Sequence, residues 1–188
     1  MTVTIDLDET KTAIQEWCAE AMEKHGGVLL PTAKFCFEDG VEKSQVFPSY
    51  GDITGDPQKD KEGILRVLFI ICQTTHPVVA ALIHEAYMYS PAEGQKVPAN
   101  GNFTTEEEYR EFKENADRRE QVIVSLETTD ERLFGMGRME RDAEGHPRIT
   151  GWAWHDALRG DTHFETRFSG FLCLKDTTIP TPMDGNIH

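Results

Sequence analysis

The last third of the chain alternates between apolar and polar residues, and this period of two constrains the fold most strongly. From Gln121 onward, QVIVSLETTDERLFGMGRMERDAEGHPRITGWAWHD reads as three strands joined by the turns TTDE and RDAEGHP. A further strand, THFETRFSGFLCL at residues 162–174, is expected after the turn ALRGD. Because successive side chains of a strand point to opposite faces, the pattern predicts an antiparallel meander that buries apolar residues and exposes ionisable ones.

The first two thirds of the chain carry signals for helices and one hairpin. Asp56-Pro57 is a typical helix start, and Asp39-Gly40 is a typical two-residue hairpin turn. We expect a helix from Asp8 or Thr10 to about His25, a hairpin around Asp39-Gly40, a deeply buried helix from Asp56 to about Thr75, a strand over PVVAALIHEAYMYS, and a helix that opens at Thr104 or Thr105 with a capping box.

This order of elements predicts an α+β fold. The expected sheet is mostly antiparallel, combines the C-terminal meander with the N-terminal hairpin, and has two or three helices packed on one face. The length of 188 residues and the 38% of hydrophobic residues suit a single domain, which we place at residues 1–175. Residues 176–188 hold two prolines and no apolar period, which predicts a flexible tail.

The charge of the chain limits its partners. The formal net charge is -14, and no segment is locally basic, so direct binding to nucleic acid or to an anionic membrane surface is not expected. A protein partner with a basic surface fits better. The first residues lack the basic and apolar regions of a signal peptide, and the longest apolar run, residues 67–72, is too short to cross a bilayer. A cytoplasmic location is therefore expected.

Common catalytic motifs fail at defined positions. His84-Glu85 begins like a zinc-protease helix, but Met88 stands where the second histidine ligand is needed. Gly135 and Gly137 begin like a dinucleotide fingerprint, but Glu140 replaces the third glycine. Neither a GxxxxGK[ST] loop nor a GxSxG motif occurs in the sequence. His84 falls on an apolar stripe and is expected to be a hydrogen-bonded core histidine, with Glu85 on the opposite face.

The densest group of metal-binding residue types lies at the end of the predicted meander. Asp161, His163 and Glu165 share one face of the expected last strand, and His155 with Asp156 or His146 stands on neighbouring segments. An Asp-His-Glu set could hold a divalent metal such as Zn or Mn. Side chains two apart on a strand are separated by ~6.6 Å, however, so three are hard to gather on one ion. Ordinary alternation, with a charged outer face, explains the same residues without a metal.

Aromatic residues supply the other candidate surface. Trp152 and Trp154 fall on one face of a strand, with Ile149 on the other. Tyr87 and Tyr89 lie at the end of the strand expected over PVVAALIHEAYMYS. Two large rings on one face indicate either a core or an exposed platform for a ligand or partner, and burial tendency favours the core.

The segment IHEAYMYS, followed by REQVIVSLETTDERLFGMGRMERD, resembles a family of small acidic α+β proteins of bacteria and their phages. In that family a strand ending in an E-A-aromatic-M motif precedes a strand that opens a hairpin. The resemblance covers about half of the chain and implies a bacterial or phage origin and an intracellular setting. It implies no activity, because the family has no assigned function.

The sequence therefore favours a non-enzymatic protein-binding or accessory module, encoded by a phage or another mobile element. Two alternatives remain. One is a metal-dependent hydrolase that uses the cluster His155, Asp161, His163 and Glu165. The other is a small-ligand-binding domain with a deep apolar pocket near Trp152, Trp154 and Tyr87. The edge strands of such a sheet could also pair two copies into a homodimer.

Overall fold

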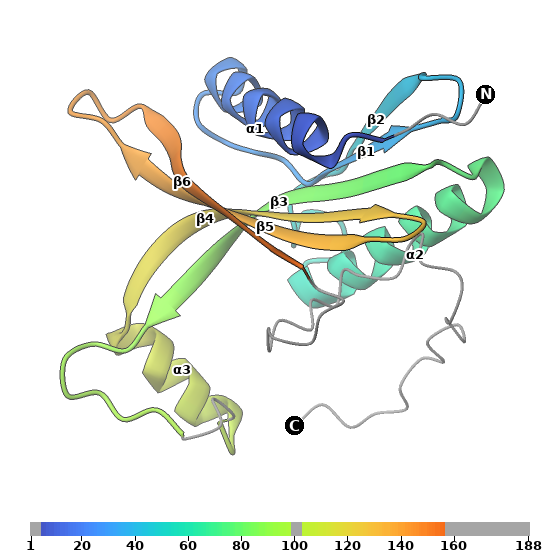
Figure 1. Cartoon of the computed structure of the whole chain (residues 1–188). Coiled ribbons are helices and arrows are strands. Elements are labelled where there is room, and N and C mark those ends of the chain that lie inside the picture. Colours follow the sequence, from blue (N-terminus) through green and yellow to red (C-terminus); the bar gives the residue numbers. More distant parts are fainter. Residues whose placement is uncertain (1–4, 99–102, 157–188) are drawn as a thin grey trace.

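The computed structural model describes residues 5–98 and 103–156. Six strands form one antiparallel sheet in the order β2-β1-β3-β4-β5-β6 (Figure 1). The strands are β1 (Thr32–Cys36), β2 (Glu42–Val46), β3 (Val79–Ser90), β4 (Asp117–Thr128), β5 (Arg132–Arg141) and β6 (Pro147–Asp156). The helices are α1 (Leu7–Lys24), α2 (Pro57–Thr75) and α3 (Glu106–Asn115). The predicted α+β class, with its N-terminal hairpin and C-terminal meander, is confirmed. The strand expected at residues 162–174 and the tail boundary after residue 175 lie outside the described residues.

Both long helices begin at an aspartate. The Asp56 carboxylate accepts the N–H groups of Gln58 and Lys59, and Pro57 occupies the first turn of α2, as expected. The first helix begins earlier than predicted, because Asp6 rather than Asp8 accepts the free N–H groups of its first turn. The shorter α3 has the predicted capping box, in which Thr105 and Glu108 bond each other's backbone N–H groups.

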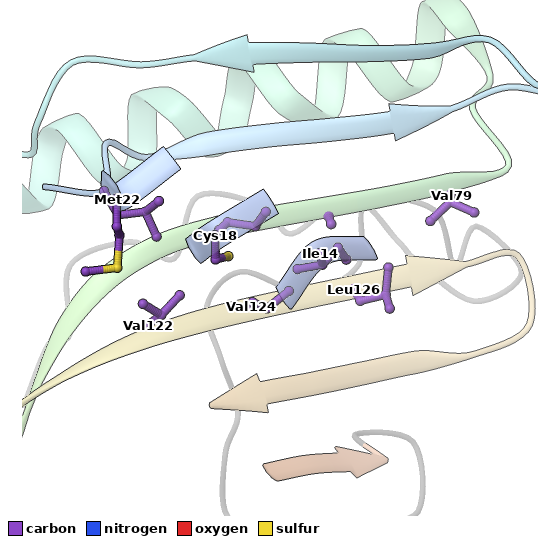
Figure 2. Packing of buried hydrophobic residues seen from close by; sticks show 10 residues of the cluster. Ile14, Cys18, Met22, Val79, Val122, Val124 and Leu126 are labelled. Atoms are coloured by element: carbon purple, nitrogen blue, oxygen red, sulfur yellow. The ribbon is translucent and has the colours of Figure 1, made fainter. Parts of the chain in front are cut away.

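The central strand β3 separates two hydrophobic cores. Its residues Val79, Ala81 and Ile83 pack with Ile14, Cys18 and Met22 of α1 (Figure 2). Its alternate residues Ala80 and Leu82 pack on the opposite face with Ile64, Leu68 and Cys72 of α2. We call these two sides of the sheet the α1 face and the α2 face.

The two long helices therefore lie on opposite faces of the sheet, and their predicted placement on one face is wrong (Figure 1). The physical reason is the unbroken apolar run of β3, which needs a cover on both sides. Helix α2 is also less buried than expected, since Val67 and Ile70 on its outer side are 44% and 59% exposed. No helix in the described part of the chain is long and apolar enough to cross a membrane.

Candidate functional site

The long strands β3 and β4 continue beyond both cores as a ribbon, whose root at Gln121 still pairs with Arg138 of β5. They pair over their whole length, from Val79 with Thr128 to Ser90 with Asp117. Among residues 85–90 and 117–121 none is buried, whereas Ile83 and Val122 at the root of the ribbon are fully buried. We call residues 85–90 and 117–121 the arm; α3 follows at its end (Figure 1).

Tyr87 and Arg118 form the exposed centre of the arm. Tyr87 is 48% exposed, and the guanidinium carbon of Arg118 lies 3.6 Å from the centroid of its ring. The stacked cation orients both side chains and holds a flat surface toward solvent. Tyr89 and Met88 are the neighbouring large side chains, each half-buried. Tyrosine, methionine and arginine are enriched where proteins contact one another.

The root of the arm is fixed by a carboxylate on the α1 face. Glu85 accepts the N–H of Leu29 at 2.6 Å and so ties the segment after α1 to β3. Burial raises the pKa of Glu85, and nearby Glu120 raises it further, against the lowering by the Leu29 hydrogen bond and by Arg141. Glu120 is itself 3.5 Å from Arg141 of β5. These contacts assign Glu85 an anchoring role in the described structure.

Trp152 and Trp154 lie on the same face of the sheet as Tyr87, but they are packed differently. Their rings stack with centroids 6.0 Å apart and an interplanar angle of 14°. Trp154 covers Gly135, and Trp152 covers Gly137, the two glycines of β5. Both rings are half-buried against the α1-side core. The two tryptophans therefore complete that core, while Tyr87 remains open to solvent.

Strand β6 departs from simple alternation. The register of β5 and β6 shifts between Met136 and Arg138, and Gly151 adopts a φ of 59°. As a result Ile149 and Trp152 both lie over Gly137, although an unbroken period of two predicted them on opposite faces.

The predicted metal cluster is only partly within the described residues. His155 lies on β6 opposite Phe134 of β5 and is half-buried. Asp161, His163 and Glu165 lie outside the described residues, so their predicted role stays a prediction.

A different acidic group occupies the turn between β5 and β6. Ligand atoms of Asp142, Glu144 and His146 lie within 4.8 Å of one another. The carboxylate of Asp142 already accepts the N–H groups of Glu144 and His146, and its other oxygen is 3.5 Å from Arg148. These bonds explain the geometry as a closed turn, without a metal.

The α2 face carries a row of buried polar side chains that the alternation alone did not reveal. Glu127 and Ser125 of β4 are 0% and 2% exposed, although the alternating pattern predicts that ionisable side chains of the meander, such as Glu127, face solvent. The Nε of Arg132 lies 3.2 Å from the Glu127 carboxylate. The Ser125 hydroxyl has no hydrogen-bond partner within the described structure. Only the tertiary placement of α2 and the neighbouring strands, which no local pattern encodes, could have signalled this burial.

His84 belongs to this row, as the apolar stripe predicted. It is 5% exposed, its Nδ1 lies 3.0 Å from the carbonyl oxygen of Glu85, and the Tyr50 ring stands edge-on at 5.7 Å. A carbonyl only accepts, so the neutral ring carries its proton on Nδ1. Burial lowers the pKa of His84 to about 4, against a raising by the Glu85 hydrogen bond, and Lys61 lowers it further.

The buried thiols of the two cores are poor nucleophiles. Burial raises the pKa of Cys72 to about 12, and the charge of Glu127 adds to the shift. Burial likewise raises the pKa of Cys18 to about 12. A thiol must lose its proton to attack a substrate, so neither cysteine is activated. The row of polar groups is thus a buried part of the sheet, whereas the arm offers side chains that a partner can reach.

Among the hollows on the described surface, two lie away from the aromatic residues of the α1 face. One, of about 590 Å³, is lined by residues of the β1–β2 turn, by Lys43 and by the end of α2. The other, of about 550 Å³, is lined by residues 95–98, Phe103 and α3. The deep pocket proposed for a small ligand near Trp152, Trp154 and Tyr87 does not coincide with either.

Comparisons with known proteins add no identity. No family model matches the chain, and searches of curated proteins and of solved structures find no match.

Proposed function

We propose that this protein is a non-enzymatic protein-binding module and that the arm is its contact surface. The observation that carries the proposal is the stacked pair of Tyr87 and Arg118 on a ribbon that belongs to neither core. The Tyr87 side chain is 48% exposed, and the guanidinium carbon of Arg118 lies 3.6 Å from the centroid of its ring. An aromatic ring and a guanidinium held in one orientation offer a partner a large contact area at a low entropic cost.

The attachment of the arm supports this function. The strands that form it run without interruption from the core, where Ile83 and Val122 are both 0% exposed. A strand clamped at its root presents its far end in a defined direction, and such preorganisation strengthens binding. Glu85 and its hydrogen bond to Leu29 add a second attachment at the point where the arm leaves the body.

Charge suggests the nature of the partner. The chain has a net charge of -14, and α3 beside the arm exposes four glutamates, Glu107, Glu108, Glu111 and Glu114. A basic protein surface would be attracted to this end of the molecule, and the attraction would weaken as salt screens it. The two arginines of the arm, Arg118 and Arg119, then contact acidic or aromatic groups within an otherwise basic surface.

A quantitative pull-down tests the proposal. The tagged protein and its Tyr87→Ala variant are incubated with a lysate of the source organism at low salt, and recovered proteins are quantified by mass spectrometry. We expect at least one protein to be recovered with the wild type and to fall about tenfold or more with the variant, the loss typical of a central interface tyrosine. Tyr87→Phe keeps the ring that Arg118 covers and should retain most of the binding.

Ile70→Ala provides the control on another surface. Ile70 is 59% exposed on the outer side of α2, so its truncation removes a comparable apolar contact away from the arm. Binding should be unchanged in this variant. Equal recovery with wild type and Tyr87→Ala, or no specific recovery at low salt, would refute the arm as a contact surface.

A further inference from the structure

The opposite end of the sheet presents an edge of a different kind. Strand β2 is the outermost strand, and all five of its residues, Glu42–Val46, are exposed. It pairs with β1 on one side, and no described strand pairs with its other side. Its side chains are thus covered on neither face, while β1 next to it is largely buried.

The register of β1 and β2 shows which backbone groups point outward. Phe37 donates its N–H to the carbonyl of Val41, and Phe47 donates to the carbonyl of Pro31, so odd-numbered residues of this hairpin bond across it. Hydrogen-bonded and non-hydrogen-bonded pairs alternate along an antiparallel ladder. The N–H and C=O groups of Glu42, Ser44 and Val46 therefore face the open edge, and the Val46 carbonyl accepts the side-chain amide of Gln45 at 2.8 Å.

Natural edges are often blocked by a lysine. Strand β2 contains Lys43, but its ammonium group lies 5.3 Å from the centroid of the Phe37 ring, on the α2 face of the hairpin. The lysine is folded back over its own hairpin and does not extend across the edge. The backbone groups of Glu42 and Ser44 consequently stay accessible.

The hollow of about 590 Å³ adjoins this hairpin and carries two carboxylates, Glu38 and Asp39, against one lysine, Lys43. It is lined by Phe37, Glu38, Asp39, Val41, Lys43, Thr75 and His76. The end of α2 at Thr75 adds the negative end of a helix dipole, with no basic residue in its last turn. Val41 offers an apolar wall on which the aliphatic stem of a lysine or arginine can lie, next to the Phe37 ring that the Lys43 ammonium already faces.

We infer that the β2 edge binds an extended segment of a partner protein by strand addition, with a lysine or arginine side chain of that segment in the adjacent hollow. Main-chain bonds to Glu42 and Ser44 supply affinity, and the carboxylates of Glu38 and Asp39 select the basic side chain. The residue that enters the hollow lies across from Val41. A second copy of the chain fits less well, because two β2 strands paired about Ser44 place Glu42 opposite Val46, with no opposite charge to meet.

Peptide binding followed by NMR tests this inference on the whole protein. The probes are the capped synthetic peptides VTVKVTV and VTVEVTV and a form of the first with alternate amides N-methylated on its pairing edge. The lysine peptide should shift the amide signals of Glu42, Ser44 and Val46, and the N-methylated form should shift none of them. The glutamate peptide should bind about two- to fivefold more weakly, as expected for the loss of an exposed ion pair.

Two variants complete the test. Ser44→Pro removes an outward N–H without removing a bond to β1, and it should abolish the response. Glu38→Lys should remove the preference for the lysine peptide while the ladder still forms. The inference goes beyond the proposed arm surface, so Tyr87→Ala should bind the peptides like the wild type.

Several results would overturn the inference. These are no response of the wild type to the lysine peptide, equal binding of the lysine and glutamate peptides, or equal binding of the N-methylated form. Dimerisation of the wild type that is lost in Ser44→Pro, measured by analytical ultracentrifugation, would show that a second copy occupies the edge instead.

Discussion

Trp154 of β6 lies directly over Gly135 of β5, so that an ideal Cβ added to the glycine would stand 2.7 Å from Cζ3 of the indole. The two residues are cross-strand partners. The next glycine of β5, Gly137, meets Trp152 and Ile149 in the same way. The glycines of GMG thus provide space for the stacked tryptophans, rather than a phosphate-binding turn.

Gly135→Ala should destabilise the protein. The added methyl group collides with a ring that is itself packed on its neighbour, and overpacking of this kind costs about 1–3 kcal/mol of unfolding free energy. Urea denaturation followed by tryptophan fluorescence measures the change. Gly63→Ala is the matched control, because a Cβ at Gly63 meets no atom within 4 Å. The substitution also replaces a glycine in the interior of α2 with a better helix former. That substitution should stabilise the protein by about 0.5–1 kcal/mol.

Arg132→Met should be far more harmful than the loss of an ordinary surface charge. It leaves the fully buried Glu127 carboxylate without the cation that stands 3.2 Å away. The expected loss of unfolding free energy is about 3–5 kcal/mol. The double variant Glu127→Leu with Arg132→Met should recover most of that loss, since it removes both charges together. If the single and double variants are equally unstable in urea, the pair is not the source of the effect.

His84 should make the protein less stable in mild acid. Its pKa falls from 6.5 to about 4 on folding, chiefly because burial disfavours the imidazolium. The unfolded chain therefore binds the extra proton between these two values. The unfolding free energy should decrease by about 1.4 kcal/mol per pH unit as pH falls through this window, and by about 3 kcal/mol in total. Above pH 6.5 this contribution is fully present.

Stability curves at several pH values isolate the histidine. His84→Gln should flatten the dependence between pH 6.5 and about 4, because the titrating group is gone. His25→Gln replaces an exposed histidine at the end of α1 and should leave the wild-type slope intact. A wild-type slope that survives His84→Gln contradicts the assignment.

The buried cysteines should resist alkylation. Because their pKa is raised from an ordinary 9.0 to about 12, the thiolate fraction of Cys18 and Cys72 at pH 8 is about a thousandfold lower than that of an ordinary thiol. Iodoacetamide in native buffer should leave both unmodified, and denaturant should expose both to rapid reaction. Peptide mapping by mass spectrometry measures each site separately. Rapid native labelling of Cys72 would show that the α2-side core opens readily.

Local signals predicted elements well where the determining atoms are close in sequence. Asp56 and Pro57 set the start of α2, and Thr105 with Glu108 set that of α3. In α1, Asp6, two residues before the expected start, supplies the cap, because several early polar residues compete for that position. In each case the deciding hydrogen bonds span only two or three residues.

Features that depend on distant segments were not predictable in the same way. Alternation in β4 separates Val124 from Ser125, but it does not show that both faces of the strand are buried. The register shift opposite Gly137 is a property of two strands, and it moved Ile149 to the side of Trp152. For the candidate site, the sequence singled out Tyr87, whereas its stacking with Arg118 required the pairing of β3 with β4.

The double burial of β3 also has a mechanical consequence. Residues 79–83 of this strand are packed between α1 and α2, whereas residues 85–90 belong to neither core. The ribbon is therefore fixed at one end, like a beam. A force applied to its outer part reaches Ile83 and Val122, where the chain is held most firmly. Torque exerted on the tip would consequently be delivered to the whole body instead of being absorbed by a hinge.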